Sequence, residues 1–225
     1  IDNLTMLAAA ATTTDRIALG TSIVTIWPRH PVIAAQQANA IAQISGGRFR
    51  FGVGPGHVTG MSRTYGAEYR TPLTALREYI AITRSLFDTG AVEYEGSVFK
   101  ASYALPAPVP NTPIMASALR PKSYELCGEV ADGAISWVSP PEYLRDVALP
   151  AIQRGADKAK RAAPPLIMHL PVCVHEDELD QRMAESTRGW GSKTLMDTLQ
   201  SVGVPAGVVN DCRDLFEDLQ LLHRG

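Results

Sequence analysis

The sequence predicts an α/β fold built around a parallel β-sheet. Two segments of the 225-residue chain, 16–54 and 113–138, each contain two apolar strand patterns separated by a helical pattern. A helix between two strands allows the strands to lie parallel, so each segment is predicted to be a βαβ unit. The chain is long enough to enclose a hydrophobic core of its own.

The first unit has the clearest pattern. A strand is predicted over 16–26, a helix over 31–44 and a second strand over 48–54. Pro31 suits the first position of a helix, and a glycine pair suits the end of it. The helix is expected to bury a stripe that one glutamine, Gln37, interrupts. The stripe consists of Ile33, Ala40, Ile41 and Ile44.

The rest of the chain continues the alternation of helices and strands. The further predicted helices are 4–13, 72–87, 120–130 and 141–161, and the further strands are 113–119, 134–138 and 166–174. Thr71 is the predicted N-cap of the helix that follows it. Residues 57–70 are expected to form a loop, and residues 93–110 an extended, proline-rich connection.

Candidate site residues lie where the predicted parallel strands end, which is where such sheets bind ligands. Residues 25–30 follow the first strand, and residues 54–57 follow the second. His57 is a candidate general acid or base, because an imidazole exchanges protons near neutral pH. The alternatives are a histidine that only contacts a ligand and a solvated loop histidine.

Two further strand ends face the same predicted mouth. Residues 117–121 open a helix, whose free N–H groups and dipole favour an anion. Arg120 could pair with a phosphate oxygen there, or lie solvated at the surface. Trp137 could flank a planar ring or anchor the core. His169 and His175 flank the last strand and have no evident partner.

Composition excludes several functional classes. The net charge is −2 and no basic run occurs, so a nucleic-acid surface is not expected. The three cysteines form no CxxC pair, which fits a reducing cytoplasm. No apolar run approaches the roughly 20 residues that span a bilayer, and no signal peptide is evident. Scattered histidines argue against a metal site, and the Gly-x-Ser-x-Gly elbow of many hydrolases is absent from the sequence.

Five short motifs occur in order along the chain, and they lie at Leu19–Val24, Arg29–Pro31, Ser45–Phe49, Gly52–His57 and Ser117–Gly133. Together they resemble the luciferase-like monooxygenase family. The resemblance implies a (β/α)8 TIM barrel that binds FMN or the deazaflavin coenzyme F420. Residues 1–175 would be this barrel, truncated at its N-terminus. Residues 176–225 instead resemble a fragment of the family III CoA-transferases and form an atypical helical tail, so a chimeric chain is expected.

The resemblance also implies roles for individual residues. The Ser22–Ile23 bond would be a cis non-proline peptide at a bulge that backs the flavin ring. In some relatives, an acidic residue at the position of His57 is the proton donor. Residues 117–121 would hold the coenzyme phosphate, with Arg120 in place of a glycine. The implied coenzyme-binding residues are Ser22, Ile23, Gly54, Ser117, Ala118, Leu119, Arg120, Pro121, Ser136 and Trp137, and His57 is the implied catalytic residue.

The implied activity is hydride transfer between the coenzyme and a small organic substrate. The motifs favour F420 over FMN. The alternatives are an FMN-dependent monooxygenase and a non-catalytic barrel remnant. Residues 93–110 would be an insertion over the active-site end, and dimerisation through barrel helices, common in the family, would give a homodimer.

Overall fold

The structure, a computed structural model, describes residues 2–169 and 176–201. It divides the chain into two compact units, residues 1–171 and 172–225. In the second unit the described residues form the helices α8 Glu176–Thr187 and α9 Ser192–Ser201. The assignment of residues 176–225 to a separate domain of transferase origin stays a prediction.

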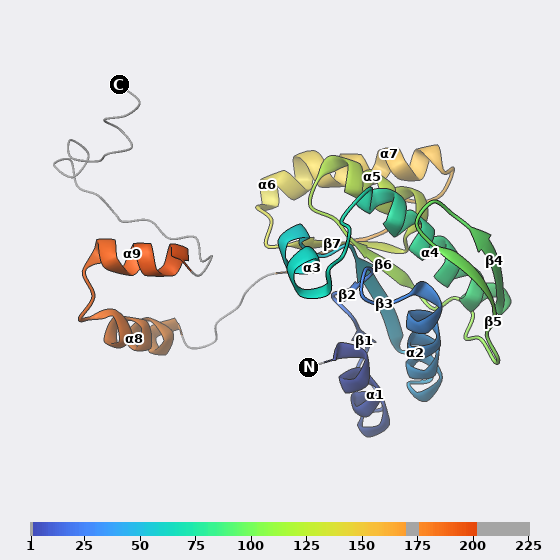
Figure 1. Cartoon of the computed structure of the whole chain (residues 1–225), viewed down its shortest axis with the longest axis horizontal. Helices are drawn as coiled ribbons and strands as arrows, with labels where there is room; N and C mark the ends of the chain where they lie inside the picture. Colours follow the sequence, from blue (N-terminus) through green and yellow to red (C-terminus); the bar gives the residue numbers. More distant parts are fainter. Residues whose placement is uncertain (1, 170–175, 202–225) are drawn as a thin grey trace. The chain divides into compact units, whose positions relative to one another are not determined.

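The first unit is built on one parallel sheet, which confirms the predicted fold class. The strand order is β1-β3-β6-β7-β8, and β2 also pairs with β3. The strands are β1 Leu19–Gly20, β2 Val24–Thr25, β3 Phe49–Gly54, β6 Ile114–Ser117, β7 Gly133–Trp137 and β8 Leu166–His169. The sheet curls beneath its covering helices into a half-barrel (Figure 1). The rest of the predicted last strand, residues 170–174, lies outside the described residues.

The predicted strand 16–26 is interrupted rather than continuous. Its two parts, β1 and β2, pair with β3 in registers that differ by one residue. One extra residue therefore lies between them and forms a bulge. Thr21 spans the bulge, since its Oγ1 donates to the Gly52 carbonyl oxygen at 2.7 Å and accepts from the Gly52 N–H at 2.8 Å. The bulge redirects the chain immediately before the predicted site.

Helices cover the outer side of the sheet, and successive helices contact one another. They are α1 Asn3–Thr13, α2 Pro31–Ile44, α4 Pro72–Thr89, α5 Pro121–Val130 and α7 Leu149–Lys158 (Figure 1). The first four were predicted within a few residues, and α7 forms the second half of the helix predicted over 141–161. Thr71 is the N-cap of α4, but its side chain makes no capping hydrogen bond and its φ is 44°. The predicted helix 141–161 contains α6 Pro141–Tyr143 and a π-helical turn at Leu144–Ala148 before α7.

The buried stripe predicted for α2 was largely wrong. Ile33 and Ile44 are 48% and 49% exposed, and Ala40 is exposed. Of the predicted stripe, Ile41 is buried. The buried face consists of Pro31, Ala34, Ala35, Ala38, Asn39, Ile41 and Ala42. Its small side chains let α2 pack closely against α1, α4 and β3, so that the isoleucines lie outside.

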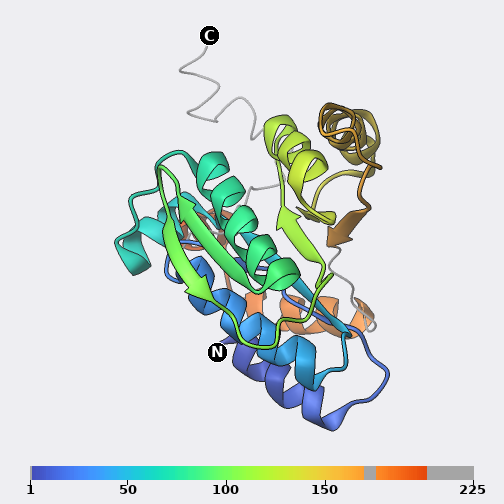
Figure 2. The same cartoon turned by 90° about the vertical axis from the view of Figure 1, so that its right-hand side faces the viewer.

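Two segments predicted as irregular contain regular structure. Residues 57–70 contain a helix, α3 Val58–Tyr65. Residues 93–110 contain most of an antiparallel hairpin, β4 Ala91–Glu95 and β5 Lys100–Ala104. The hairpin runs beside α4 (Figure 2). The predicted insertion over the active-site end is thus a hairpin packed on the outer helical layer.

One carboxylate fastens this hairpin. Glu78 on α4 is 5% exposed. Its Oε1 accepts from the Ser97 N–H at 2.8 Å and the Ser97 hydroxyl at 2.7 Å, and its Oε2 accepts from the N–H groups of Val98 and Phe99, both at 2.9 Å. Burial alone would raise the pKa of this carboxyl, but the hydrogen bonds outweigh burial and lower it. The tip of the hairpin therefore closes around an ionised glutamate.

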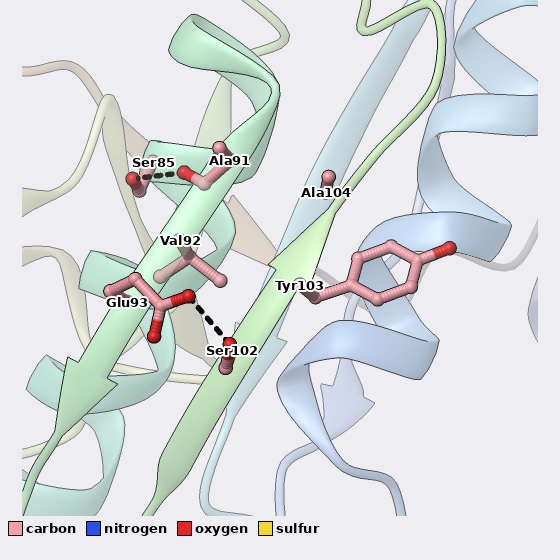
Figure 3. A pocket seen from close by; sticks show the side chains of 7 residues that line it. All are labelled: Ser85, Ala91, Val92, Glu93, Ser102, Tyr103 and Ala104. Carbon is pink, nitrogen blue, oxygen red and sulfur yellow. Dashed lines mark hydrogen bonds between the residues drawn. The ribbon is translucent and has the colours of Figure 1, made fainter.

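A hollow of about 570 Å³ lies on this hairpin and is lined by Ser85, Ala91, Val92, Glu93, Ser102, Tyr103 and Ala104 (Figure 3). Glu93 and Ser102 are hydrogen-bonded across it. The Tyr103 ring points away toward α2 (Figure 3), where its hydroxyl accepts from Gln36 at 2.6 Å. None of the lining residues belongs to the parallel sheet. The hollow is thus separate from the strand ends at which ligands are expected.

At the opposite end of the strands, Arg48 joins α1 to the sheet. Its guanidinium donates to the carbonyl oxygens of Thr14 at 2.6 Å, Ile17 at 2.7 Å and Ser45 at 2.8 Å. These carbonyls include those left free where a helix ends, and a cation is favoured there.

We expect Arg48→Ala to lower the free energy of unfolding by about 2–3 kcal/mol, because several charge-assisted hydrogen bonds are lost at once. Arg50→Ala is the matched control on the same strand, because Arg50 is exposed; its effect should stay within about 0.5 kcal/mol. Urea titrations followed by circular dichroism measure both. Equal urea midpoints for the two variants would show that Arg48 does not hold α1 to the sheet.

Candidate active site

The predicted site residues lie at the carboxyl ends of β3, β6 and β7 and at the bulge before β2, along one edge of the curled sheet. The Ser22–Ile23 peptide bond is cis, as the resemblance implied. It lies at the bulge just before β2. Asn3 at the start of α1 donates from its side chain to the Ile23 carbonyl oxygen at 3.2 Å. The preceding helix therefore helps to fix this bond in place.

Gly54 brings three strands together without a side chain. A Cβ atom on Gly54 would lie 2.0 Å from the Ser117 Oγ and 2.5 Å from the Ile23 Cδ1. Glycine lets these side chains close over the end of β3, so that Gly54 itself is buried beneath Ser117 and Ile23. The structure thus assembles three predicted coenzyme-binding residues, Ile23, Gly54 and Ser117, into a shallow cradle.

His169, predicted to have no evident partner, has two. It ends β8, and its Nε2 lies 2.8 Å from the Ser22 Oγ. Its ring also meets Trp137 edge to face, with centroids 5.4 Å apart and planes at 71°. The predicted strand 166–174 placed His169 in the middle of a strand, so its position at the carboxyl end of β8, next to the site, was not predicted. The register that pairs Trp137 with His169 is the signal that places the two side chains together.

The loop before α5 is already hydrogen-bonded in the manner of an anion site. The Ser123 Oγ accepts from the N–H groups of Leu119 at 3.2 Å and Arg120 at 3.0 Å. From α6, the Tyr143 hydroxyl donates to the Leu119 carbonyl oxygen at 2.9 Å. Arg120 and Lys122 are exposed and, within the described residues, form no ion pair. A hydroxyl oxygen thus sits where a phosphate oxygen would accept, beside two available cations.

The predicted residues Ala118 and Ser136 are covered. Ala118 is 2% exposed, and Ser136 is fully buried. The Ser136 Oγ and the Tyr124 hydroxyl are both buried and interact with one another. Burial raises the pKa of Tyr124. Ser136 lies one residue before Trp137 on β7, so its side chain faces the opposite side of the sheet. Direct contact between Ser136 and a ligand stays a prediction.

His57 is the exposed N-cap of α3, and its side chain makes no capping hydrogen bond. The turn before it is held by two aromatic residues that the sequence did not single out as a pair. The Trp27 Nε1 donates to the Pro55 carbonyl oxygen at 2.8 Å, and the Tyr69 hydroxyl donates to the Gly56 carbonyl oxygen at 2.9 Å. The two rings lie 5.2 Å apart. The turn that presents His57 is therefore fixed, while the imidazole is accessible.

Other chemistries have less support in the described residues. No group of three His, Cys, Asp or Glu side chains comes together there as a metal site. Cys127 is fully buried, and burial raises the pKa of its thiol to about 12. Cys173 and Cys212 lie outside the described residues. No helix in residues 2–169 or 176–201 is long and apolar enough to cross a membrane.

The profile of the luciferase-like monooxygenase family matches residues 1–213. The chain belongs to this family. The match continues through most of residues 176–225, so the resemblance of that segment to a CoA-transferase gains no support. Relatives of the chain include enzymes that are F420-dependent by name.

Two relatives are a reductase and an F420-dependent dehydrogenase by name. The chain is 34% identical over 161 residues to the 5,10-methylenetetrahydromethanopterin reductase of Methanolobus tindarius, covering 71% of this chain and 49% of the relative. It is 31% identical over 210 residues to the F420-dependent glucose-6-phosphate dehydrogenase of Beutenbergia cavernae, covering 89% of this chain and 61% of the relative. The chain therefore spans about half to three fifths of the length of these relatives.

The fold agrees with a solved relative. The structure of the coenzyme F420 dependent tetrahydromethanopterin reductase from Methanopyrus kandleri superimposes with a TM-score of 0.67 at 28% identity. The superposition covers 75% of this chain and 54% of that one. The parallel sheet described above is thus part of a TIM-barrel architecture.

Proposed function

We propose that this chain contains the coenzyme-binding part of an F420-dependent oxidoreductase that acts on a small organic substrate. The single observation that supports this most strongly is the cradle of Ile23, Gly54 and Ser117. In it, the side chains of Ile23 and Ser117 close over Gly54 at the end of β3, beside the cis peptide bond. The F420 enzymes among the relatives favour the deazaflavin over FMN. When bound, F420 accepts or donates a hydride at C5 of its ring.

The residues present fit such a group. Ile23 and Ser117 are partly exposed above the buried Gly54, so a planar ring can rest on them with Ile23 as an apolar contact. Ser22 and Trp137 lie next to the cradle on neighbouring strand ends. Arg120 and Lys122 offer positive charge to the coenzyme phosphate, beside two backbone N–H groups that Ser123 already satisfies. These residues would orient the coenzyme ring against the sheet and exclude water from it.

His57 is the proposed proton-handling residue. It lies three residues after Gly54 in the sequence and is exposed just beyond the end of β3. An imidazole there can hold or release a proton at a ring nitrogen as the substrate reacts. FMN remains the alternative coenzyme, and a non-catalytic barrel remnant remains the alternative to an enzyme.

A binding titration tests the proposal. We expect purified protein to bind F420 saturably, with weaker binding of FMN, when ring fluorescence is followed. Arg120→Gln should weaken F420 binding about 3–10-fold, since one charge-assisted contact is worth roughly 1–1.5 kcal/mol. Arg50→Gln is the control and should bind as the native chain does. Preference for FMN would favour the alternative of an FMN-dependent monooxygenase. If a folded sample binds neither coenzyme, the alternative of a non-catalytic barrel remnant is supported.

A second variant tests the cradle itself. Gly54→Ala should weaken F420 binding by at least about tenfold, because the new methyl group meets Ser117 and Ile23. The double variant Gly54→Ala/Ser117→Gly removes the closest of these neighbours. It should recover part of the melting temperature and part of the affinity. Native affinity in the single variant would show that the ring binds elsewhere.

A further inference from the structure

The mouth carries an exposed apolar face that includes Trp137, one of the proposed coenzyme contacts, and extends beyond it to Val138 and His169. Trp137 ends β7 and is 64% exposed, and Val138 directly after it is 50% exposed. Leu119, two residues after β6, is also exposed. Large apolar side chains gathered at strand ends of a site are contacts for an apolar ligand.

The backbone at Val138 is held in a costly conformation. Its φ is 39°, a left-handed value that a β-branched residue rarely adopts. Such strain persists where the surrounding structure fixes it, and it is concentrated at ligand-binding sites. Here it turns the chain immediately after Trp137, where the Ser139 hydroxyl donates to the Trp137 carbonyl oxygen at 3.2 Å.

One polar group is set within this face. His169 lies in register with Trp137 and edge-on to its ring, and its Nε2 lies 2.8 Å from the Ser22 Oγ. The imidazole and hydroxyl together offer one hydrogen-bonding point to a substrate oxygen. The strand ends 22–23, 136–138 and 168–169 contain one ionisable side chain, His169.

Charge argues against an anionic substrate at this face. Arg29 is paired with Asp2. Arg120 and Lys122 lie at the start of α5, where the proposed function assigns them to the coenzyme phosphate. Within the described strand ends, no lysine or arginine is left to pair with a phosphorylated substrate.

We propose that Trp137, Val138 and His169 form the substrate-recognition face of this site. Its ligand is an uncharged compound with a compact apolar body, such as an alicyclic ring, and one hydroxyl or carbonyl oxygen. Trp137 and Val138 contact the body, and His169 with Ser22 positions the oxygen. The inference rests on the proposed function for the place of the coenzyme, but its binding step can be measured without the coenzyme.

The test uses the full chain with cyclohexanone as the uncharged probe and glucose 6-phosphate as the anionic one. Saturation-transfer NMR titrations are run with and without F420. Cyclohexanone should bind saturably in at least one of these states, and glucose 6-phosphate at least about tenfold more weakly. Tighter binding of the sugar phosphate, or no cyclohexanone binding in either state, overturns the inference.

Variants assign the binding to the face. Trp137→Ala should raise the dissociation constant for cyclohexanone about tenfold, and Trp190→Ala, an exposed tryptophan of the second unit, should leave it unchanged. His169→Leu should weaken binding, while His169→Gln, which keeps a polar group of similar reach, restores most of it. Val138→Gly should weaken binding with an unchanged or raised melting temperature, because glycine accepts the left-handed φ. Native affinity in both Trp137→Ala and Val138→Gly overturns the assignment.

The two proposals fail in different ways. F420 binding without any cyclohexanone binding overturns the recognition face alone. Cyclohexanone binding that depends on Trp137, in a folded chain that binds neither F420 nor FMN, overturns the proposed function and keeps the face as a small-molecule site.

Discussion

Gly155→Ala is expected to destabilise the first unit by about 2–4 kcal/mol. Gly155 on α7 and Gly128 on α5 face each other where these helices cross. A Cβ on Gly155 would lie 1.9 Å from the Glu125 carbonyl oxygen, and a Cβ on Gly128 would lie 2.1 Å from the Ile152 carbonyl oxygen. Backbone atoms cannot turn aside as a side chain can, so the helices must separate. The melting temperature should fall by roughly 5–15 °C.

The matched control is Gly60→Ala in α3, where an added Cβ meets nothing within 4 Å. There the better helix propensity of alanine should raise stability by up to about 1 kcal/mol. The double variant Gly128→Ala/Gly155→Ala should cost less than the sum of the two single changes, because the helices separate once. Additive losses would show that the two glycines act at independent contacts.

Glu78→Gln is expected to cost about 2–4 kcal/mol of unfolding free energy. The amide keeps the shape of the side chain but turns a donor NH2 group toward hairpin groups that are themselves donors. Glu95→Gln on the same hairpin is the control. Its carboxylate is exposed and pairs with Lys100 at the surface, so that change should stay within about 0.5 kcal/mol.

The pH dependence gives an independent reading of Glu78. Its pKa is lowered by folding, so its contribution to stability is complete above the unfolded value of about 4.3 and is lost as the pH falls through the lower folded value. The difference in stability between the native chain and Glu78→Gln should therefore be largest near neutral pH and shrink below about pH 4. Urea unfolding at several pH values measures it. A difference that is constant with pH would contradict an ionised Glu78.

Sequence patterns located most helices and strands because these depend on local periodicity and on caps such as Pro31. They failed where tertiary packing decides. The buried face of α2 is made of alanines, since the helix lies close to its neighbours, and this closeness is absent from hydropathy. The hairpin at 91–104 was missed because its tip is ordered by Glu78, a residue 19 positions from Ser97.

The site divides in the same way. The Ser22–Ile23 bond could be anticipated by resemblance, and its cis geometry is confirmed. The contact of His169 with Ser22 could not be anticipated, because the two residues lie 147 positions apart in the sequence and meet across the curled sheet. The roles of His57 and of the residues around Gly54 stay predictions that the titrations decide.

The hydrogen bonds between Glu78 and the hairpin determine which amino-acid substitutions this part of the protein should tolerate. Three of the four hydrogen bonds to Glu78 come from backbone N–H groups, which almost any residue supplies. Tolerance to substitution should therefore differ between the two partners. Most substitutions at positions 97–99 keep the backbone hydrogen bonds, whereas no other residue has the length and charge of Glu78. Gly96 shares the restriction, because a Cβ there would lie 2.3 Å from the Glu78 Oε2. Glu78 fixes the tip of the hairpin, while Val92 and Ala101 bury its strands against the core, so divergence is expected at the exposed positions of the hairpin.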